Sequence, residues 1–318
     1  MASWQAHTVS FVLRHTFKPR LARAKDALHA RAILNGPPLP RRRTVKTRSA
    51  IRIAPATMGG VPGEWVESGP ESSAGVLVYL HGGGYFACSA RTHRPYTTFF
   101  ARQGFKVFAP NYRLAPEHPF PAAVIDAVAA WRAVRAEAGA ATPMVIGGDS
   151  AGGGLALATM LKLRDEGEAL PAAAALFSPL TDLVGIGDSR RFNDRRCAMF
   201  YGTGLARATE FYMAGGDPRD PLASPLYADL RGLPPLLIHV GGHETLLDDS
   251  TQLAERARAA GVPVALEVWP VVPHVWQLFH QIVPEGRRSL AAASAFLGEA
   301  VAEARAAGQA SLAARTIS

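Results

Sequence analysis

A serine lies between two glycines in the run Gly148-Asp149-Ser150-Ala151-Gly152, with an apolar stretch before it and a helix-like stretch after it. A strand, a tight turn and a helix form the context in which Gly-x-Ser-x-Gly becomes a nucleophile elbow. The turn forces the serine into strained backbone angles and lifts its Oγ clear of the sheet. The flanking glycines are needed because a Cβ at either position would collide with neighbouring backbone. The sequence therefore predicts that Ser150 is a nucleophile for attack on a carbonyl carbon.

A second glycine-rich run, His81-Gly82-Gly83-Gly84, directly follows an apolar stretch that is typical of a buried strand. Such a turn can point backbone N–H groups at the oxyanion that forms when a hydroxyl attacks a carbonyl. The N–H of Ala151, the residue after the serine, would add another donor. A flexible turn is the alternative interpretation, and the serine motif downstream favours the oxyanion hole.

A serine nucleophile needs a base, and four histidines follow Ser150 in the chain. His239 falls inside an apolar run and is expected in a buried strand, whereas His280 falls in a helix-like segment. In a strand–elbow–helix enzyme of this kind the triad follows the order serine, acid, histidine. His243 is disfavoured because it adjoins the acidic residues and leaves no room for a separate acid before it. His274 lies in a proline-bracketed loop after an expected strand, where α/β enzymes place catalytic groups. We therefore predict that His274 is the base.

The acid that orients the base is expected after the strand that ends near Val240. Glu244, Asp248 and Asp249 are all candidates. Glu244 is nearest to the strand end, on the loop, whereas the two aspartates are expected near the start of the next helix, where carboxylates often cap free N–H groups. Glu244 is the preferred acid and Asp248 is the second choice.

Together these motifs make the chain resemble the bacterial hormone-sensitive lipase family, also called family IV esterases, of the α/β-hydrolase fold. The resemblance extends over roughly residues 45–300. That family usually carries Asp-Pro-Leu after the seventh strand, with this aspartate as the acid. Here Glu244-Thr245-Leu246 takes that position, which resembles the members that use glutamate. The matching segments are His81-Gly82-Gly83-Gly84, Tyr112-Arg113-Leu114-Ala115-Pro116-Glu117, Gly148-Asp149-Ser150-Ala151-Gly152-Gly153, Ser178-Pro179-Leu180-Thr181-Asp182 and Pro273-His274.

The resemblance implies one α/β-hydrolase domain over residues 1–318, with a mostly parallel central sheet flanked by helices. A helical cap would form from about residues 1–48 and 185–220, over a catalytic body of residues 49–184 and 221–318. The cap's aromatic residues are expected in a packed core, and some could line an acyl pocket. Related enzymes often dimerise through the last sheet edge, so a homodimer is possible.

The resemblance also implies hydrolysis of short-chain carboxylic esters, from acetyl to octanoyl, through an acyl-enzyme on Ser150. Amide, lactone or acetylated substrates remain alternatives because the triad chemistry is shared. A non-catalytic receptor of this fold would lack His274, and a dehydratase would carry threonine in place of Ser150. Asp149 is expected to brace the elbow, and Arg113 and Glu117 to anchor the loop after the fourth strand. The implied oxyanion donors are Gly83, Gly84 and Ala151.

Apolar runs alternate with helix-like segments from Val76 onward, which predicts an α/β fold with a mostly parallel sheet. The expected strands are Val76–Leu80, Lys106–Pro110, Met144–Gly147, Ala174–Phe177, Leu236–Val240 and Ala265–Trp269. The expected helices are Ala122–Ala138, Leu155–Glu166, Thr251–Ala260 and Arg287–Ala306.

Basic residues are concentrated in the first 50 residues, which hold 11 Lys or Arg and one acidic residue. The run Arg41-Arg42-Arg43 could bind nucleic acid or an anionic membrane, but a solvated arm is the simpler interpretation, so no nucleic-acid partner is expected. An apolar face at helical spacing and a division into two helices at Pro19 are expected in this arm. The apolar positions are Val9, Leu13, Phe17, Leu21 and Leu28.

The remaining features favour a cytoplasmic enzyme without a cofactor. The N-terminus lacks the pattern of a secretory signal, and no stretch is long and apolar enough to span a membrane. Cys88 and Cys197 are far apart and are expected to be reduced thiols. No metal is expected, because His and Cys do not cluster with ligand spacing, and the glycine turns lack nucleotide-binding patterns.

Overall fold

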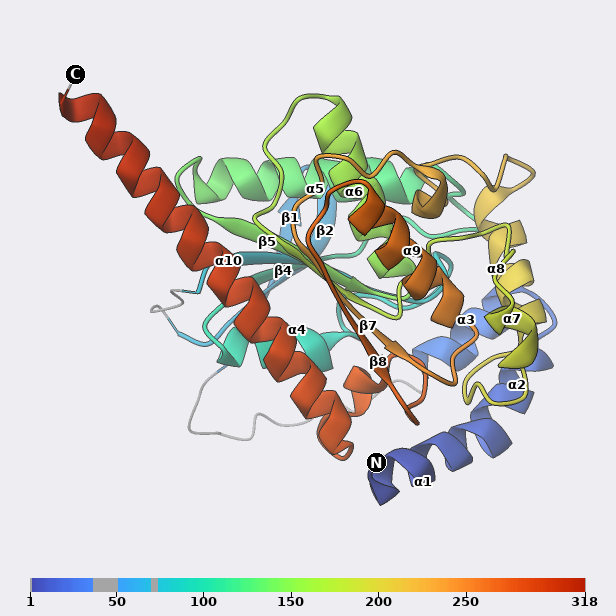
Figure 1. Ribbon diagram of the computed structural model, residues 1–318. Coiled ribbons are helices and arrows are strands. Elements are labelled where there is room, and N and C mark those ends of the chain that lie inside the picture. The colour runs from blue at the N-terminus through green and yellow to red at the C-terminus, as the bar shows by residue number, and fades with distance from the viewer. Residues whose placement is uncertain (1, 37–50, 70–73, 318) are drawn as a thin grey trace.

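The computed structural model describes residues 2–36, 51–69 and 74–317. Its centre is an eight-stranded sheet in the order β1-β2-β4-β3-β5-β6-β7-β8 (Figure 1). Strands β3 to β8 pair in parallel, and β1 and β2 add an antiparallel pair at one edge. The strands are β1 (Arg52–Met58), β2 (Val61–Glu67), β3 (Val76–Leu80), β4 (Lys106–Pro110), β5 (Met144–Asp149), β6 (Ala174–Phe177), β7 (Leu236–Gly241) and β8 (Val264–Trp269).

The prediction of a mostly parallel sheet is confirmed, and each of the six expected strands is present, three of them one or two residues longer than expected. The sequence analysis did not predict β1 and β2. Both strands lie half exposed and carry prolines, Pro55 and Pro62, which weaken a strand pattern. Their one clear signal was Gly59-Gly60, whose positive φ angles of 60° and 79° form the hairpin turn.

The sheet is covered on both faces, because its parallel strands present apolar side chains to each side. In β3, Val78 and Leu80 belong to the core under α5 (Ala122–Ala138), α6 (Ala151–Asp165) and α9 (Leu247–Ala259). Leu77 and Tyr79 belong to the core under α4 (Arg94–Arg102) and α10 (Pro284–Ile317). Figure 1 shows α10 crossing the sheet and continuing beyond it.

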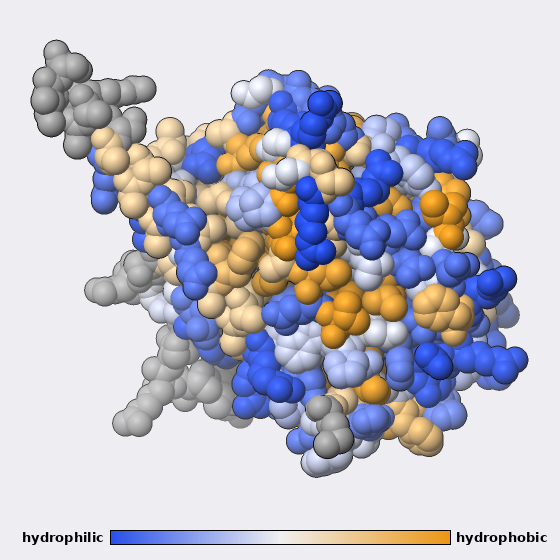
Figure 2. All heavy atoms as spheres, in the orientation of Figure 1, coloured by the Kyte–Doolittle hydropathy of each residue, from blue (hydrophilic) through white to orange (hydrophobic). Residues whose placement is uncertain are grey.

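Helix bounds differ from expectation mainly at helix starts. Helix α5 has the expected bounds, whereas α6 begins at Ala151 and α9 at Leu247, four residues earlier than predicted in each case. Helix α10 also runs eleven residues past Ala306, since its alanine-rich sequence has high helix propensity. Figure 2 shows weakly hydrophobic residues mixed with hydrophilic ones along this helix.

The N-terminal arm consists of α1 (Trp4–Val12), a π-helical turn (Leu13–Phe17), α2 (Lys18–Ala22) and α3 (Ala27–Asn35). The predicted division at Pro19 is wrong. The wider π turn directly before Pro19 accommodates its missing N–H, so the helical path continues to Ala22. The break comes at Asp26, which caps α3 by accepting from the N–H of His29 at 2.8 Å.

This later break also changes the expected apolar face. Phe17 and Leu21 pack against the core, but Leu28 is 59% exposed. Leu28 lies on α3, whose buried face is formed by Ala27, Ala30 and Ile33 instead. The basic run 41–43 and the rest of the expected cap segment up to residue 48 lie outside the described residues.

A second segment, from Gly185 to Asp220, lies beside the arm and carries α7 (Ser189–Phe192) and α8 (Gly202–Met213) (Figure 1). Lys18 of the arm donates from Nζ to the carbonyl oxygen of Cys197 at 2.9 Å, and Arg207 of α8 donates to that of Ala24 at 2.9 Å. Within the described ranges, no helix is long and apolar enough to cross a membrane.

Candidate active site

Ser150 occupies the turn between β5 and α6 with φ 53° and ψ −122°, the strained backbone that the elbow predicts. A Cβ on Gly148 would lie 2.3 Å from the carbonyl oxygen of Gly152. A Cβ on Gly152 would lie 2.1 Å from that of Leu80. Both glycines are therefore required by close backbone packing, as the sequence analysis expected.

The glycine-rich loop after β3 faces the same cavity as Ser150. Gly83 and Gly84 line that cavity and have φ angles of 115° and 61°. A Cβ on Gly83 would lie 2.3 Å from the carbonyl oxygen of Ala87, so only glycine fits there. In the part of the chain that the structure describes, the N–H groups of Gly83, Gly84 and Ala151 donate to no acceptor. They are free to donate to an oxyanion.

Asp149 braces the loop and the elbow together, as expected. Its carboxylate accepts from the Tyr79 hydroxyl at 2.9 Å and from the N–H of Gly82 at 3.2 Å. His93 Nε2 lies 3.1 Å from the second oxygen of this carboxylate. All of these groups are buried, so the first residues of the glycine-rich loop after β3 are fixed from beneath.

His81 begins the same loop and stacks on Tyr112 with ring centroids 4.2 Å apart. The Tyr112 hydroxyl donates to the carbonyl oxygen of His81 at 2.6 Å. Burial lowers the pKa of His81 to about 3, so its imidazole is neutral near pH 7. His81 therefore shapes the loop and takes no part as a charged group.

Glu244 and His274 meet on the loops that follow β7 and β8. Oε2 of Glu244 lies 2.5 Å from Nδ1 of His274, and the glutamate is 1% exposed. Its other oxygen, Oε1, accepts from the Ser178 hydroxyl at 2.7 Å and from the N–H of Gly241 at 2.6 Å. Three hydrogen bonds thus orient a buried carboxylate toward the imidazole.

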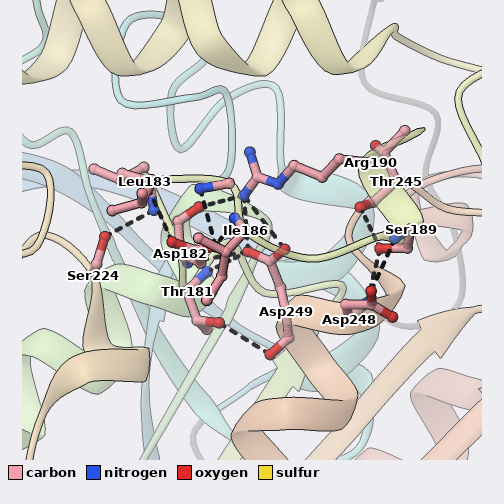
Figure 3. Close-up of polar contacts among 12 residues, drawn as sticks. Thr181, Asp182, Leu183, Ile186, Ser189, Arg190, Ser224, Thr245, Asp248 and Asp249 are labelled. Atoms are coloured by element: carbon pink, nitrogen blue, oxygen red, sulfur yellow. Dashed lines mark hydrogen bonds and ion pairs between the residues drawn. The ribbon is translucent and has the colours of Figure 1, made fainter.

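The two aspartates point elsewhere (Figure 3). Asp248 accepts from the N–H of Ser189 at 2.8 Å. Asp249 accepts from the N–H of Thr181 at 3.0 Å and pairs with Arg190 at 3.2 Å. Burial raises the pKa of Asp249 to about 6, against the lowering effect of Arg190. Neither aspartate is hydrogen-bonded to His274.

The other three downstream histidines do not line the cavity that Ser150 lines. His239 is fully buried in β7, bonds the Ser289 hydroxyl at 2.7 Å, and has a pKa lowered by burial to about 4. His280 ends a short 3-10 helix (Trp276–Phe279), less than the helical segment expected there. His243 lies in the turn after β7.

Ser150 and His274 line one cavity of about 750 Å³. No hydrogen bond joins the Ser150 hydroxyl to His274, and such catalytic bonds often tighten only when substrate binds. Seven aromatic and methionine side chains of the second cap segment were expected in a packed core, with some able to line an acyl pocket; four of them line the cavity and three do not. Met199, Phe200, Tyr201 and Phe211 line it, whereas Phe192 is exposed and Tyr212 and Met213 are in the core.

Cys88 adjoins the oxyanion loop and lines the cavity, but it is poorly suited to attack. Burial and the Asp149 charge raise the pKa of its thiol to about 12. Among the described residues, no group of three or more His, Cys, Asp or Glu could hold a metal ion.

Comparison with known proteins identifies the family. The family described as alpha/beta hydrolase fold matches residues 77–278. The chain belongs to this family. An acetyl-hydrolase of Streptomyces hygroscopicus is 45% identical over 248 residues, which are 78% of this chain and 83% of that protein. A solved esterase of the bacterial hormone-sensitive lipase family is 41% identical, with a TM-score of 0.84 and coverage of 95% of this chain and 99% of that one. The structure of EstE5, soaked by p-nitrophenyl butyrate, is 37% identical, with a TM-score of 0.85 and coverage of 95% and 100%.

These neighbours place this α/β hydrolase among the bacterial hormone-sensitive lipase-type esterases, and it is a carboxylic ester hydrolase. The resemblance seen in the sequence is thereby confirmed.

The sequence analysis missed several residues that support the hydrolase site. His93 contacts Asp149 from a position eleven residues beyond Gly82, and no motif marks it. Ser178 lies in one of the segments that match the family, but its bond to Glu244 depends on the pairing of β6 with β7.

Arg113 and Glu117, which were expected to anchor the loop after the fourth strand, have different partners. Arg113 pairs with Asp126 at 2.7 Å, whereas Glu117 pairs with Arg31 of the N-terminal arm at 2.5 Å.

Proposed function

We propose that this esterase cleaves short-chain carboxylic esters through an acyl-enzyme on Ser150. Ser150 Oγ attacks the ester carbonyl while Nε2 of His274 takes the hydroxyl proton. The N–H groups of Gly83, Gly84 and Ala151 donate to the oxyanion of the tetrahedral intermediate. His274 returns the proton to the leaving alcohol. It then takes a proton from water, whose oxygen attacks the acyl carbon, and passes that proton to Ser150 Oγ as the bond from Oγ to the acyl carbon breaks and the carboxylic acid leaves.

Glu244 is the proposed acid of this triad. Its 2.5 Å contact with Nδ1 of His274 fixes the ring through that nitrogen and leaves Nε2 to act as the base, on a histidine that lines the same cavity as Ser150. The carboxylate also stabilises the imidazolium formed during each half-reaction. The observation that carries the proposal is this buried contact between Glu244 and His274, because His274 lines the same cavity as the strained Ser150.

We also propose that residues 1–48 and 185–220 act as a cap that limits the acyl chain. Phe17 and Leu21 from the arm and Phe200 and Phe211 from the second segment wall the cavity. Apolar walls favour an alkyl chain, and a cavity of limited volume favours a short one. We expect activity to fall beyond about eight acyl carbons. The structure of EstE5 soaked by p-nitrophenyl butyrate supports an ester of this size class.

The test is a series of 4-nitrophenyl esters of increasing acyl length, assayed with the wild-type enzyme and with Ser150→Ala. We expect the wild-type rate to peak at short chains and the variant to lose about five orders of magnitude in kcat. A wild-type rate no faster than the variant would overturn the proposal. Efficient cleavage of long-chain triglyceride would overturn the proposed chain-length limit alone.

Amide, lactone and acetylated substrates belong in the same assay, because the triad chemistry serves them equally. A higher kcat/KM on one of these classes than on every simple ester would replace the proposed substrate while keeping the proposed triad.

A further inference from the structure

A stretch of the second cap segment, Gly187 to Phe200, contacts the loop that carries Glu244. Asn193 is fully buried there, immediately after α7. Its Nδ2 donates to the carbonyl oxygen of Gly242 at 3.0 Å and to that of Glu244 at 2.9 Å. One side-chain amide therefore binds two backbone oxygens within three residues of loop, including that of the proposed acid itself.

Ser189, at the start of α7, binds the same loop where it enters α9 (Figure 3). Its hydroxyl donates to the carbonyl oxygen of Thr245 at 2.9 Å and accepts from the N–H of Asp248 at 3.0 Å. Its own N–H donates to the Asp248 carboxylate at 2.8 Å. Ser189 thus fixes the loop on the C-terminal side of Glu244, as Asn193 does on the N-terminal side.

Arg190 adds an ion pair to the same junction. It lies 3.2 Å from the Asp249 carboxylate and also donates to the carbonyl oxygen of Asp182 (Figure 3). Further along the stretch, the ring of Phe200 meets that of His274 edge-on, with centroids 4.8 Å apart. The same stretch therefore contacts both the acid loop and the base.

The loop is held only in part by bonds outside the cap segment: the N–H of Gly241 donates to the Glu244 carboxylate at 2.6 Å, and the N–H of Gly242 donates to the carbonyl oxygen of Trp269 at 2.7 Å. It links β7 to α9, and the carbonyl oxygens of Gly242 and Thr245 accept from side chains of the cap segment. Carbonyl oxygens that lose these partners are left without a hydrogen bond, so the loop would move to recover such bonds. Any movement would carry the Glu244 carboxylate away from Nδ1 of His274.

We propose that Asn193 and Ser189 are positioning residues for the catalytic acid, so that the cap segment completes the triad as well as walling the cavity. This inference rests on the proposed function of Glu244. Neither residue lines the cavity that Ser150 and His274 share. They act through the backbone of the Glu244 loop.

The hydrogen bonds of the Asn193 amide suggest one substitution, Asn193→Asp, that tests its positioning role directly. The amide uses both N–H groups of Nδ2, and Oδ1 has no partner among the described residues. Asn193→Asp keeps the volume but replaces two donors with an acceptor that faces two carbonyl oxygens. The loop is then repelled without a cavity being created.

We expect Asn193→Asp to lower kcat on a short-chain ester about 10- to 100-fold, since a displacement near 1 Å at a catalytic group has this effect. KM should change less than about threefold, because the cavity wall is unaltered. The matched control is Asp194→Ala, the next residue. Asp194 accepts from the N–H of Gly202 at 2.7 Å, within the cap segment.

A double-mutant cycle with Glu244→Ala decides between positioning and general destabilisation. If Asn193 acts through Glu244, Asn193→Asp should lower kcat by less than about twofold in the Glu244→Ala background. The effect of Asp194→Ala should be the same in both backgrounds. An Asn193→Asp loss that persists fully without Glu244, or that appears only in KM, would overturn the inference.

If Asn193→Asp does not fold, Ser189→Ala takes its place in the same cycle, because it removes only one oxygen atom. A normal kcat for Glu244→Ala would defeat the proposed acid, and with it the proposed function of this residue. A large loss in Glu244→Ala together with an additive Asn193 effect would defeat the positioning inference alone.

Discussion

The two halves of the site are held in place by different forces. The half with the proposed nucleophile and oxyanion donors, the nucleophile half, is fixed mainly by backbone packing at the ends of β3 and β5, where Gly148, Gly152 and Gly83 leave no space for a Cβ, and Asp149 adds buried hydrogen bonds beneath it. The half with the proposed acid and base, the acid–base half, lies on the loops after β7 and β8. There, side-chain hydrogen bonds from Ser178 and from the cap segment hold the Glu244 loop.

This difference matters because steric and polar constraints fail in different ways. A Cβ placed about 2 Å from a backbone oxygen cannot be accommodated without moving a strand or a helix, so a larger residue at one of these glycines disrupts the fold. A lost hydrogen bond leaves the fold intact and lets one loop drift. The nucleophile half should therefore tolerate almost no substitution at its glycines. The acid–base half should lose activity in graded steps.

The largest expected effect is that of Gly152→Ala. Its Cβ would lie 2.1 Å from the carbonyl oxygen of Leu80, so the elbow and β3 cannot both keep their places. We expect loss of at least about 3 kcal/mol of unfolding free energy and loss of measurable esterase activity. Urea unfolding followed by circular dichroism, with the ester assay, measures both. Gly298→Ala in α10 is the control, because nothing lies within 4 Å of its Cβ and the variant should be as stable as wild type or more so. Normal activity in Gly152→Ala would contradict the steric account.

Next in size is the difference between Glu244→Gln and Asp248→Asn. The glutamine can present an N–H to Nδ1 of His274 and so favour the wrong tautomer, which should lower kcat about 10³- to 10⁴-fold. Asp248 instead binds the N–H of Ser189, and asparagine keeps an acceptor there, so a loss below about tenfold is expected. Steady-state kinetics on 4-nitrophenyl butyrate measures both variants. A larger loss in Asp248→Asn would show that the acid has been assigned to the wrong residue.

A smaller effect is expected from His93→Phe in the nucleophile half. The phenyl ring keeps the packing but removes the contact of Nε2 with Asp149 and with the N–H of Gly82. The oxyanion loop should loosen and kcat should fall roughly tenfold, less than for direct loss of an oxyanion donor. A trifluoromethyl ketone inhibitor, whose adduct places an oxyanion in this hole, should bind more weakly by a similar factor. If kcat falls while inhibitor affinity is unchanged, His93 does not act through the oxyanion hole.

The same contrast explains what could be predicted from the sequence. The six parallel strands, the strained turn at Ser150 and the glycine-rich turn after β3 were predictable because each depends on local residue types, namely apolar runs and glycines at tight turns. The contact of Glu244 with His274 agrees with the preferred choice, which rested on closeness to a strand end. The positions of His93, Ser189 and Asn193 were not predictable. Their partners lie far away in the sequence, and single polar residues in loops carry no periodic signal. The hairpin of β1 and β2 was missed because its exposed, proline-containing strands lack an apolar run.

The smallest expected effect is a dependence of the unfolding free energy on pH. It comes from Asp249, which holds the cap segment on the side of the acid–base half. Asp249 anchors α7 through Arg190, and burial raises its pKa from the ordinary 3.8 to about 6. The folded state therefore binds more protons than the unfolded state between these values. The stability that protonation contributes is complete below pH 3.8 and is lost as pH rises through about 6. Relative to Asp249→Asn, which cannot ionise, wild type should lose roughly 1–2 kcal/mol of unfolding free energy between about pH 5 and about pH 7.5.

Urea unfolding of both proteins across this range measures the difference. Glu117→Gln is the control, because Arg31 lowers the pKa of Glu117 to about 2 and this exposed carboxylate stays ionised throughout. Its difference from wild type should be nearly constant with pH. If wild type instead gains stability over Asp249→Asn as pH rises, the Arg190 charge outweighs burial. The cap segment would then be held to α9 mainly by an ion pair, and the polar constraints on the acid–base half would strengthen as pH rises through this range.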